Sequence, residues 1–397
     1  MTHSSRAAAA AAPSTPIPFF RPDLGEEEIA AVVETIRSGW VTVGPRTHEF
    51  EQVFAARIGA PHAIAVSSCT AALHLALDAL DLEPGDEVIT STLTFTATGA
   101  TIVHAGARPV LVDCTPDTLN IDPQDVLRKI TPRTRAVVPV HYAGHPAPMD
   151  EILEIARRHR LAVVEDAAHA LPASYHGRTI GTIGDVTCFS FYATKNLCTG
   201  EGGMLTTANA ALADRLRTRR LHGMSRDAWR RYSNEGSWRY DVSYPGFKYN
   251  MTDIAAAMGL VQLRRLPGLH RRRAALAALY TELLADHPGV QLPTTLPDVE
   301  HAWHLYIIRL RPERLRIHRD HVIEELKAAG IASQVHFIPL HMHSFYRDTF
   351  GYRPEHFPVA SAAGETILSL PFFTLMSDDD VRRVVTSLRR ILDANRR

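Results

Sequence analysis

Residues 186–207 read VTCFSFYATKNLCTGEGGMLTT, and this stretch is the most informative about the fold. The apolar run at residues 186–191 predicts a buried strand, and Lys195 follows the point where that strand ends. A glycine-rich turn at residues 199–203 comes next, and residues 203–207 predict a further strand. Ligands of open α/β sheets bind beyond the carboxyl ends of strands, so we expect Lys195 to lie in an active site.

Lysine is rare in this chain, because the 43 basic residues include only Lys129, Lys195, Lys248 and Lys327. Arginine supplies the same charge, but only lysine offers an amine with a tunable pKa that condenses with an aldehyde. Lys129 and Lys327 lie in charged, helix-like stretches that are typical of a protein surface. We therefore interpret Lys195 as the residue that forms an imine with pyridoxal phosphate.

The pattern around this stretch predicts an α/β fold. The expected strands are residues 63–66, 87–90, 109–112, 136–140, 161–165, 186–190 and 203–207, and the helices between them include 70–80, 123–129 and 149–159. Several of these runs are too uniformly apolar to be half exposed, which favours a mostly parallel seven-stranded sheet covered by helices on both faces.

A smaller C-terminal α/β domain is expected after this sheet. A long arginine-rich helix at residues 252–286 leads to a strand at 303–310, a helix at 320–329, a strand at 333–337 and a helix at 378–395. We place the cofactor-binding large domain at residues 17–265 and the small domain at 266–397. Residues 1–16 are alanine-rich and interrupted by proline, so we expect a disordered leader.

Composition argues against several classes of protein. Acidic and basic residues balance at 43 each, so no net field favours nucleic acid or an anionic membrane. No window is apolar enough for a membrane helix, and the first residues lack the apolar segment of a signal peptide. The cysteines show no CxxC spacing, which favours a cytoplasmic location; they are Cys69, Cys114, Cys188 and Cys198.

Two strand ends carry residues suited to pyridoxal phosphate. Cys69 and Thr70 open a helix after the strand at 63–66, where free backbone N–H groups suit a phosphate, although ordinary helix capping is the alternative. Asp166 follows the strand at 161–165 and could hold a proton on a pyridine nitrogen, with an N-cap as the alternative. His169 could hydrogen-bond the phenolic oxygen of the same ring.

Three further residues are weaker candidates taken singly. Phe95 could stack on a flat ring, although an aromatic at a strand end is more often part of a core. Ser190 could donate its hydroxyl to the phosphate. Asn250 lies in GFKYNMTD, residues 246–253, which otherwise reads as a turn before a helix.

Taken together and in this order, these motifs resemble the pyridoxal-phosphate-dependent sugar aminotransferases of the DegT/StrS type. That family belongs to the fold type I aspartate aminotransferase superfamily, and the resemblance runs from about residue 20 to the C-terminus. Cys69 stands where many relatives have glycine, and His169 where many have glutamine. A related branch that removes a sugar hydroxyl has histidine in place of the Schiff-base lysine, so Lys195 argues against that branch.

The resemblance implies roles for individual residues. Lys195 is the catalytic residue, which joins the cofactor and then moves a proton between it and the substrate carbon. The cofactor-binding residues implied are Cys69, Thr70, Phe95, Asp166, His169, Ser190, Lys195 and Asn250. Asn250 would reach the site of a neighbouring subunit, which implies a homodimer with shared active sites. The substrate-binding residues implied are His336, His341, Tyr346 and Arg347, and no metal is implied.

The activity that follows is transamination of a nucleotide-linked keto sugar, dTDP- or UDP-linked and preferably 4-keto, in polysaccharide or antibiotic biosynthesis. L-Glutamate would donate the amino group and leave as 2-oxoglutarate. The alternatives are a 3-keto sugar, an aminocyclitol precursor, an aromatic amino-acid precursor, or a non-catalytic regulator that binds a sugar nucleotide. A metal hydrolase built on His336, His341 and His343 is disfavoured, because their spacing does not match HExxH.

Overall fold

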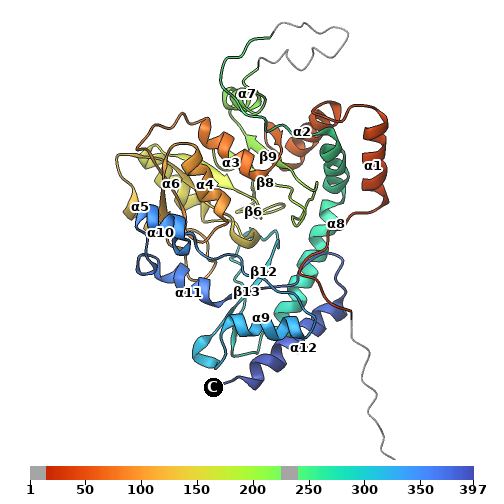
Figure 1. Cartoon of the computed structure of the whole chain (residues 1–397), viewed down its shortest axis with the longest axis vertical. Coiled ribbons are helices and arrows are strands. Elements are labelled where there is room, and N and C mark those ends of the chain that lie inside the picture. Colours follow the sequence, from red (N-terminus) through yellow and green to blue (C-terminus); the bar gives the residue numbers. More distant parts are fainter. Residues whose placement is uncertain (1–14, 225–239) are drawn as a thin grey trace, which may run out of the picture.

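The structure is a computed structural model that describes residues 15–224 and 240–397. A large helix-covered sheet and a smaller α/β unit lie one above the other (Figure 1). Residues 1–14 of the expected leader lie outside the described residues. Directly after the expected leader, Ile17 forms a parallel β-bridge with Ile331.

The large sheet has seven strands, as the sequence predicts. Their spatial order is β1 (His62–Val66), β9 (Gly203–Thr207), β8 (Val186–Ser190), β5 (Ala162–Asp166), β4 (Thr134–Val138), β2 (Glu87–Ser91) and β3 (Arg108–Val112). All neighbouring pairs are parallel except those on either side of β9. The strand expected at 136–140 is displaced toward residue 134, and the others lie within a residue of their expected ends.

Helices cover both faces of this sheet. They are α1 (Glu26–Arg37), α2 (Pro45–Ile58), α3 (Cys69–Asp78), α4 (Thr96–His104), α5 (Pro123–Lys129), α6 (Met149–His159), α7 (Ala210–Arg219) and α8 (Asp253–Leu284). One buried cluster includes Phe50 of α2 and Ile152 of α6. A second cluster, on the opposite face, includes Leu75 of α3 and Leu216 of α7. Burial on both faces explains why the strands read as continuous apolar runs.

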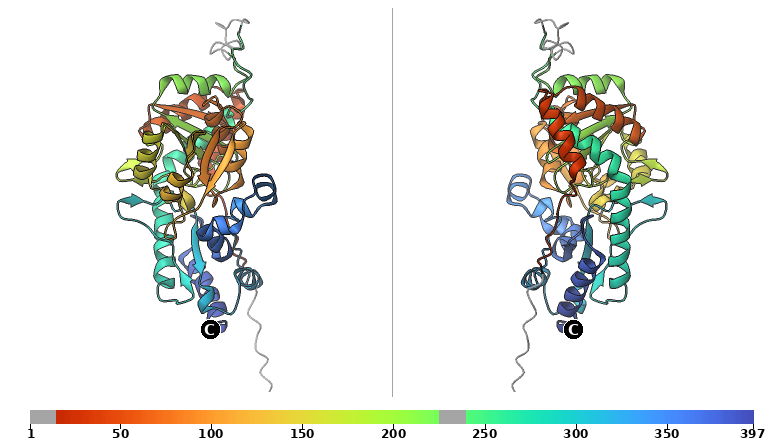
Figure 2. Two further views of the ribbon diagram at one scale, coloured as in Figure 1. Left: turned by 90° about the vertical axis from the view of Figure 1, so that its left-hand side faces the viewer. Right: turned by 90° about the vertical axis from the view of Figure 1, so that its right-hand side faces the viewer.

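The 32-residue helix α8 connects the two units, as Figure 2 shows. Its side chains up to Leu266 belong to a core of the large unit, and those from Leu276 onward belong to the core of the small one. Pro267 lies inside the helix at this transition. A domain division near residue 266 fits this packing and stays our proposal.

The small unit is a three-stranded sheet covered by helices. Its elements are β10 (Val290–Gln291), β12 (Tyr306–Leu310), α9 (Arg319–Ala328), α10 (Ser344–Phe350), α11 (Pro358–Thr366), β13 (Ile367–Leu370) and α12 (Asp378–Ala394). A third small sheet joins β11 (Val299–Glu300) to β6 (Ser174–Tyr175) and β7 (Arg178–Thr179). None of the helices in the described part of the chain is long and apolar enough to cross a bilayer.

The prediction of a strand at residues 333–337 was wrong. This segment makes only an isolated bridge, between Gln334 and Ser369 of β13. Beyond Gln334 its groups bond to side chains instead of a ladder, because His336 Nδ1 pairs with Ser369 Oγ at 2.9 Å and the His336 carbonyl accepts from the Tyr142 hydroxyl. The strand that does form here, β13, was not expected from the sequence.

Candidate active site

Four strands deliver the candidate residues to one edge of the large sheet. The pairing pattern makes β1, β2, β5 and β8 run in the same direction, so their carboxyl ends meet at that edge. The start of α3 follows β1, Phe95 follows β2, Asp166 ends β5 and Ser190 ends β8. Residues distant in sequence are brought together for this topological reason.

Lys195 lies in the loop after β8, and hydrogen bonds close this loop at its base. Phe191 N donates to Gly202 O at 2.9 Å, and Thr199 N donates to Phe191 O at 2.9 Å. Burial lowers the pKa of Lys195 to about 8, although the charges of Cys69 and Asp166 oppose that change. A sizeable fraction of the amine is therefore neutral near physiological pH, as a nucleophile requires.

Asp166 is a buried carboxylate held by two neutral donors. Thr98 Oγ1 donates to Oδ2 at 2.7 Å, and Ala168 N donates to Oδ1 at 3.1 Å. Burial raises the pKa of Asp166, and the Thr98 hydrogen bond opposes the rise. The preceding Glu165 faces the opposite side of the sheet, where it pairs with His141 at 2.9 Å.

His169 carries a buried polar atom that the chain leaves unpaired. Among the described residues, its Nδ1 has no hydrogen-bond partner. Its ring packs against His304 with centroids 4.4 Å apart and stacks on Phe337 with centroids 5.8 Å apart. Burial, reinforced by Lys195, lowers the pKa of His169 well below its ordinary value, so the ring is neutral.

The start of α3 lies against the backbone of β9. Ser68 is the N-cap and accepts from Ala71 N at 3.1 Å, while Cys69 and Thr70 are the first helical residues, whose N–H groups have no partner within the helix. A Cβ on Gly203 would approach Ser68 O to 2.6 Å and Cys69 N to 2.8 Å. Only glycine at position 203 therefore lets the helix start approach the sheet so closely.

The other cofactor candidates differ in exposure. Phe95 is 56% exposed and packs against Phe337 with centroids 5.6 Å apart. Ser190 is buried, and its Oγ accepts from Tyr192 N at 3.4 Å. Asn250 is buried beside Val66 of β1, where its side chain accepts from Lys248 Nζ.

The four substrate candidates are not equivalent. His336 is close enough to Lys195 for the lysine's charge to contribute, after burial, to lowering the pKa of His336 to about 4. His341 is fully buried, and its ring nitrogens pair with Thr92 Oγ1 and Ser361 Oγ. Tyr346 is also buried, whereas Arg347 is exposed and pairs with Asp348.

Sequence reasoning missed two residues that surround the lysine. His304 Nε2 lies 3.5 Å from Lys195 Nζ, and Asn196 Oδ1 lies 3.3 Å from His304 Nδ1. One signal for His304 was present in the sequence, namely its place just before an apolar run that predicts a buried strand. A buried imidazole needs a hydrogen-bond partner.

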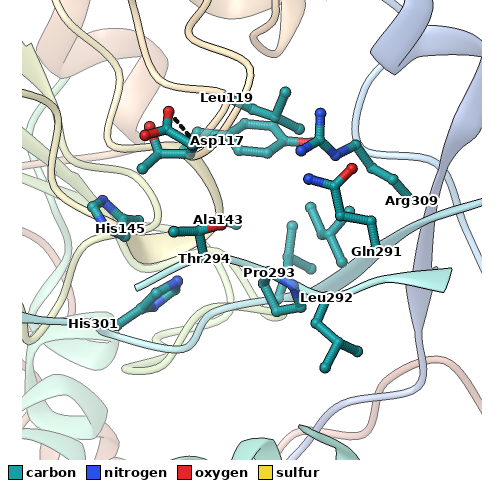
Figure 3. Close-up of a pocket in the computed structure, with 14 residues that line it drawn as sticks. Asp117, Leu119, Ala143, His145, Gln291, Leu292, Pro293, Thr294, His301 and Arg309 are labelled. Carbon is teal, nitrogen blue, oxygen red and sulfur yellow. Dashed lines mark hydrogen bonds between the residues drawn. The ribbon is translucent and has the colours of Figure 1, made fainter. Parts of the chain in front are cut away.

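Two small cavities lie near the domain junction. One, lined by Lys195, Asn196 and Arg273 among others, has a volume of about 10 Å³. The other is about 30 Å³ and lies between the Ala143–His145 turn and the segment from Gln291 to Arg309, as Figure 3 shows. Each has room for roughly one or two waters and not for a sugar.

The residues at this edge fit pyridoxal phosphate. His169, whose ring feels the charge of Lys195, has an unpaired buried Nδ1 among the described residues, and the Asp166 carboxylate is buried without a cationic hydrogen-bond partner among them. The start of α3 offers N–H groups that have no partner within the helix. When bound, the group supplies an aldehyde and a ring that accepts electrons.

Comparisons with known proteins agree. Residues 22–389 match the DegT/DnrJ/EryC1/StrS aminotransferase family. The chain is 51% identical to the spore coat polysaccharide biosynthesis protein SpsC of Bacillus subtilis, over 95% of this chain and 97% of that protein. An uncharacterized protein of Methanocaldococcus jannaschii, MJ1066, is 52% identical over 96% of this chain and 98% of its own. The putative sugar aminotransferase Spr1654 of Streptococcus pneumoniae, solved in a PLP form, superposes with a TM-score of 0.89 at 36% identity, covering 96% of this chain and 99% of that one.

Proposed function

This chain belongs to the DegT/DnrJ/EryC1/StrS aminotransferase family and is a pyridoxal-phosphate-dependent sugar aminotransferase, and we propose that it transfers the amino group of L-glutamate to a nucleotide-linked keto sugar. The single observation that best supports the catalytic assignment is the meeting of Lys195, Asp166 and His169 at one sheet edge. A binding protein without catalysis would have no need of a buried amine whose pKa is lowered toward neutrality.

Each side chain has a task that its surroundings suit. Lys195 Nζ is the base that moves a proton at the substrate carbon, because its neutral form is accessible near pH 8. Asp166 would hold a proton at the nitrogen of the bound ring, and His169 Nδ1 would bond to its phenolic oxygen. The N–H groups at the start of α3, with the hydroxyls of Thr70 and Ser190, bind the phosphate.

For the sugar nucleotide we propose contacts from His336 and Arg347. The buried side chains of Tyr346 and His341 would hold the segment at residues 336–347 in place. Phe95 is proposed to stack on the cofactor ring, and the exposed side chain of Ile338 offers apolar surface to the nucleotide base. A 4-keto sugar is our preferred acceptor, and the name of SpsC favours a polysaccharide pathway.

We also propose a cytoplasmic homodimer. Asn250 then contributes to the phosphate site of the partner, which completes each active site. All four cysteines are free thiols and are buried, which suits a reducing compartment.

The test begins with the holoenzyme and L-glutamate alone. We expect the visible band of bound pyridoxal phosphate to bleach and one equivalent of 2-oxoglutarate to form. Adding a dTDP- or UDP-linked 4-keto sugar should restore the band and yield an amino sugar nucleotide, detected by mass spectrometry. A band that ignores glutamate contradicts the donor, and recovery only with a 3-keto sugar contradicts the 4-keto preference.

A further inference from the structure

A histidine carried by the small unit reaches the catalytic lysine. His304 lies just before β12, is 5% exposed, and brings Nε2 to 3.5 Å from Lys195 Nζ. Lys195 belongs to the large unit, so this contact crosses the junction between the two. Within the described part of the chain, His304 is the side chain recorded at hydrogen-bonding distance from Nζ.

Hydrogen bonds inside the chain determine which nitrogen of His304 carries the hydrogen. Asn196 Nδ2 donates to Ala302 O at 2.7 Å, which orients the amide and leaves Oδ1 facing His304 Nδ1 at 3.3 Å. A carbonyl oxygen only accepts, so Nδ1 carries the hydrogen. Nε2 therefore presents a lone pair to Lys195.

The imidazole is also neutral and held in place. Burial, together with the nearby charge of Lys195, lowers the pKa of His304 well below its ordinary value. Its backbone N donates to Ala143 O at 3.1 Å, and its carbonyl accepts from Arg273 Nη1 at 3.2 Å. Arg273 is itself buried and also donates to Trp303 O, so the backbone on both sides of the His304 side chain is held by hydrogen bonds.

We propose that His304 is a positioning residue that accepts a hydrogen bond from Lys195 Nζ whenever the amine is not joined to the cofactor. This proposal rests on the proposed function, because it takes Lys195 as the catalytic amine. The free amine sits on a long flexible side chain, and an acceptor of fixed tautomer keeps it directed into the site during the stage at which it must move a proton.

Loss of this acceptor changes the pKa of Lys195, which loss of a purely structural contact would not. An acceptor bonds more strongly to an ammonium than to a neutral amine, so its removal lowers the pKa of the lysine. The other charged or titratable groups around Lys195 are Cys69, Asp166, His169, His336 and, behind His304, Arg273. Cys69 and Asp166 raise the lysine's pKa through their charge, and the two histidines are neutral.

The test measures this pKa directly, on full-length protein loaded with pyridoxamine phosphate, in which the Lys195 amine is free. Trace labelling with acetic anhydride across a pH series, read by mass spectrometry, gives the reactivity midpoint of each lysine. Lys129, Lys248 and Lys327 serve as references within the same chain.

In His304→Leu we expect the Lys195 midpoint to fall by about one pH unit, since hydrogen bonds to charged groups are worth somewhat more than one tenfold step. His304→Gln, whose side-chain oxygen also accepts, should recover most of the difference. His287→Gln, at a buried histidine of the small unit with no interaction with Lys195, should leave the midpoint unchanged.

Asn196→Ala provides a second route if the leucine variant does not fold. Without Oδ1, the hydrogen is free to move to Nε2, and the midpoint should again fall. An unchanged midpoint in either folded variant overturns the proposal. Failure of the proposed function is a separate observation, namely turnover by Lys195→Ala or a holoenzyme that ignores both substrates.

Discussion

The Thr98 hydroxyl donates to the Asp166 carboxylate at 2.7 Å, and a second threonine, Thr94, bonds to Thr98 at 2.8 Å. The side-chain partner of this buried carboxylate is thus a neutral donor from the first turn of α4, the helix for which Phe95 is the N-cap, and its other donor is the backbone N–H of Ala168. A neutral donor stabilises the charge without cancelling it. The carboxylate therefore remains available to a cation, such as a protonated pyridine ring.

Replacing Asp166 by Asn should lower kcat by about 10²- to 10³-fold, the size expected when a preorganised charge is lost. Thr98→Val is the milder change and should cost about tenfold, since it removes one hydrogen bond to a charged group. Single-turnover rates with L-glutamate measure both. Equal rates in wild type and Asp166→Asn would refute the role of this carboxylate.

The same carboxylate should make the cofactor-free protein less stable at neutral pH. Burial raises the folded-state pKa of Asp166 above its unfolded value, so the folded state binds the proton more tightly. The free-energy cost of burying the ionised carboxylate is present above that raised pKa and is relieved as pH falls through it. Cofactor-free Asp166→Asn should melt at a higher temperature than wild type at pH 8, and the difference should shrink as pH falls toward the unfolded pKa of about 4. A difference that grows on acidification would reverse this sign.

Lys195→Ala should reduce turnover by about 10⁴-fold, the upper end for acid–base catalysis, because the amine that joins the cofactor is lost as well. Lys195→Arg is the matched control: it keeps the positive charge but has no amine, so it should be equally inactive. Circular dichroism should show both variants folded. Activity retained by the arginine variant would mean that charge alone suffices.

Lowering of the Lys195 pKa to about 8 predicts the pH profile. The neutral amine becomes more abundant as pH rises through that value, so the single-turnover rate with L-glutamate should increase between about pH 7 and pH 9 and then level off. Stopped-flow absorbance over this range measures it. A rate that falls across the same interval would contradict the neutral lysine as base.

Gly203→Ala should weaken cofactor binding by more than about tenfold, because its Cβ would lie within 2.5 Å of the Ser68 carbonyl carbon and push the start of α3 away. Gly268→Ala is the control, since the nearest atom to its Cβ is Arg271 Nη2 at 3.9 Å. Equilibrium titration of the two cofactor-free variants with pyridoxal phosphate makes the comparison.

We expect Lys195→Ala and Asn250→Ala each to be inactive alone, and mixing the two tests the shared site. If Asn250 serves the partner's site, a heterodimer of Lys195→Ala and Asn250→Ala contains one intact site. Random exchange then restores about a quarter of wild-type activity, since half of the dimers are mixed and each has one working site. A mixture of Lys195→Ala with Asp166→Asn should recover nothing, because both residues belong to the same site of one chain.

Much of the fold was readable because each strand of the large sheet is buried on both faces. That burial leaves apolar runs such as residues 186–191, and all seven strands were located from them. Residues 333–337 misled because their apolar side chains, Val335 and Phe337, pack against a separate cluster while the backbone makes only an isolated bridge at Gln334.

The candidate site divides in the same way. Lys195, Asp166 and the start of α3 could be proposed because each lies at or shortly after the end of a strand, and strand ends are local features of sequence. His304 and Asn196 were not, because their roles depend on where the small unit docks and on which way one amide points.

The sequence by itself determined the order of strands along the chain and the family, and it singled out Lys195 as the proposed reactive amine, since burial and local motifs leave a direct pattern in residue types. Only the tertiary structure decided that the hydroxyl of Thr98, 68 residues before Asp166, bonds to that carboxylate, and that the small unit places a neutral imidazole against Lys195. Such contacts depend on angstrom-scale distances between separately packed elements, and no periodicity in the chain encodes a distance of that kind.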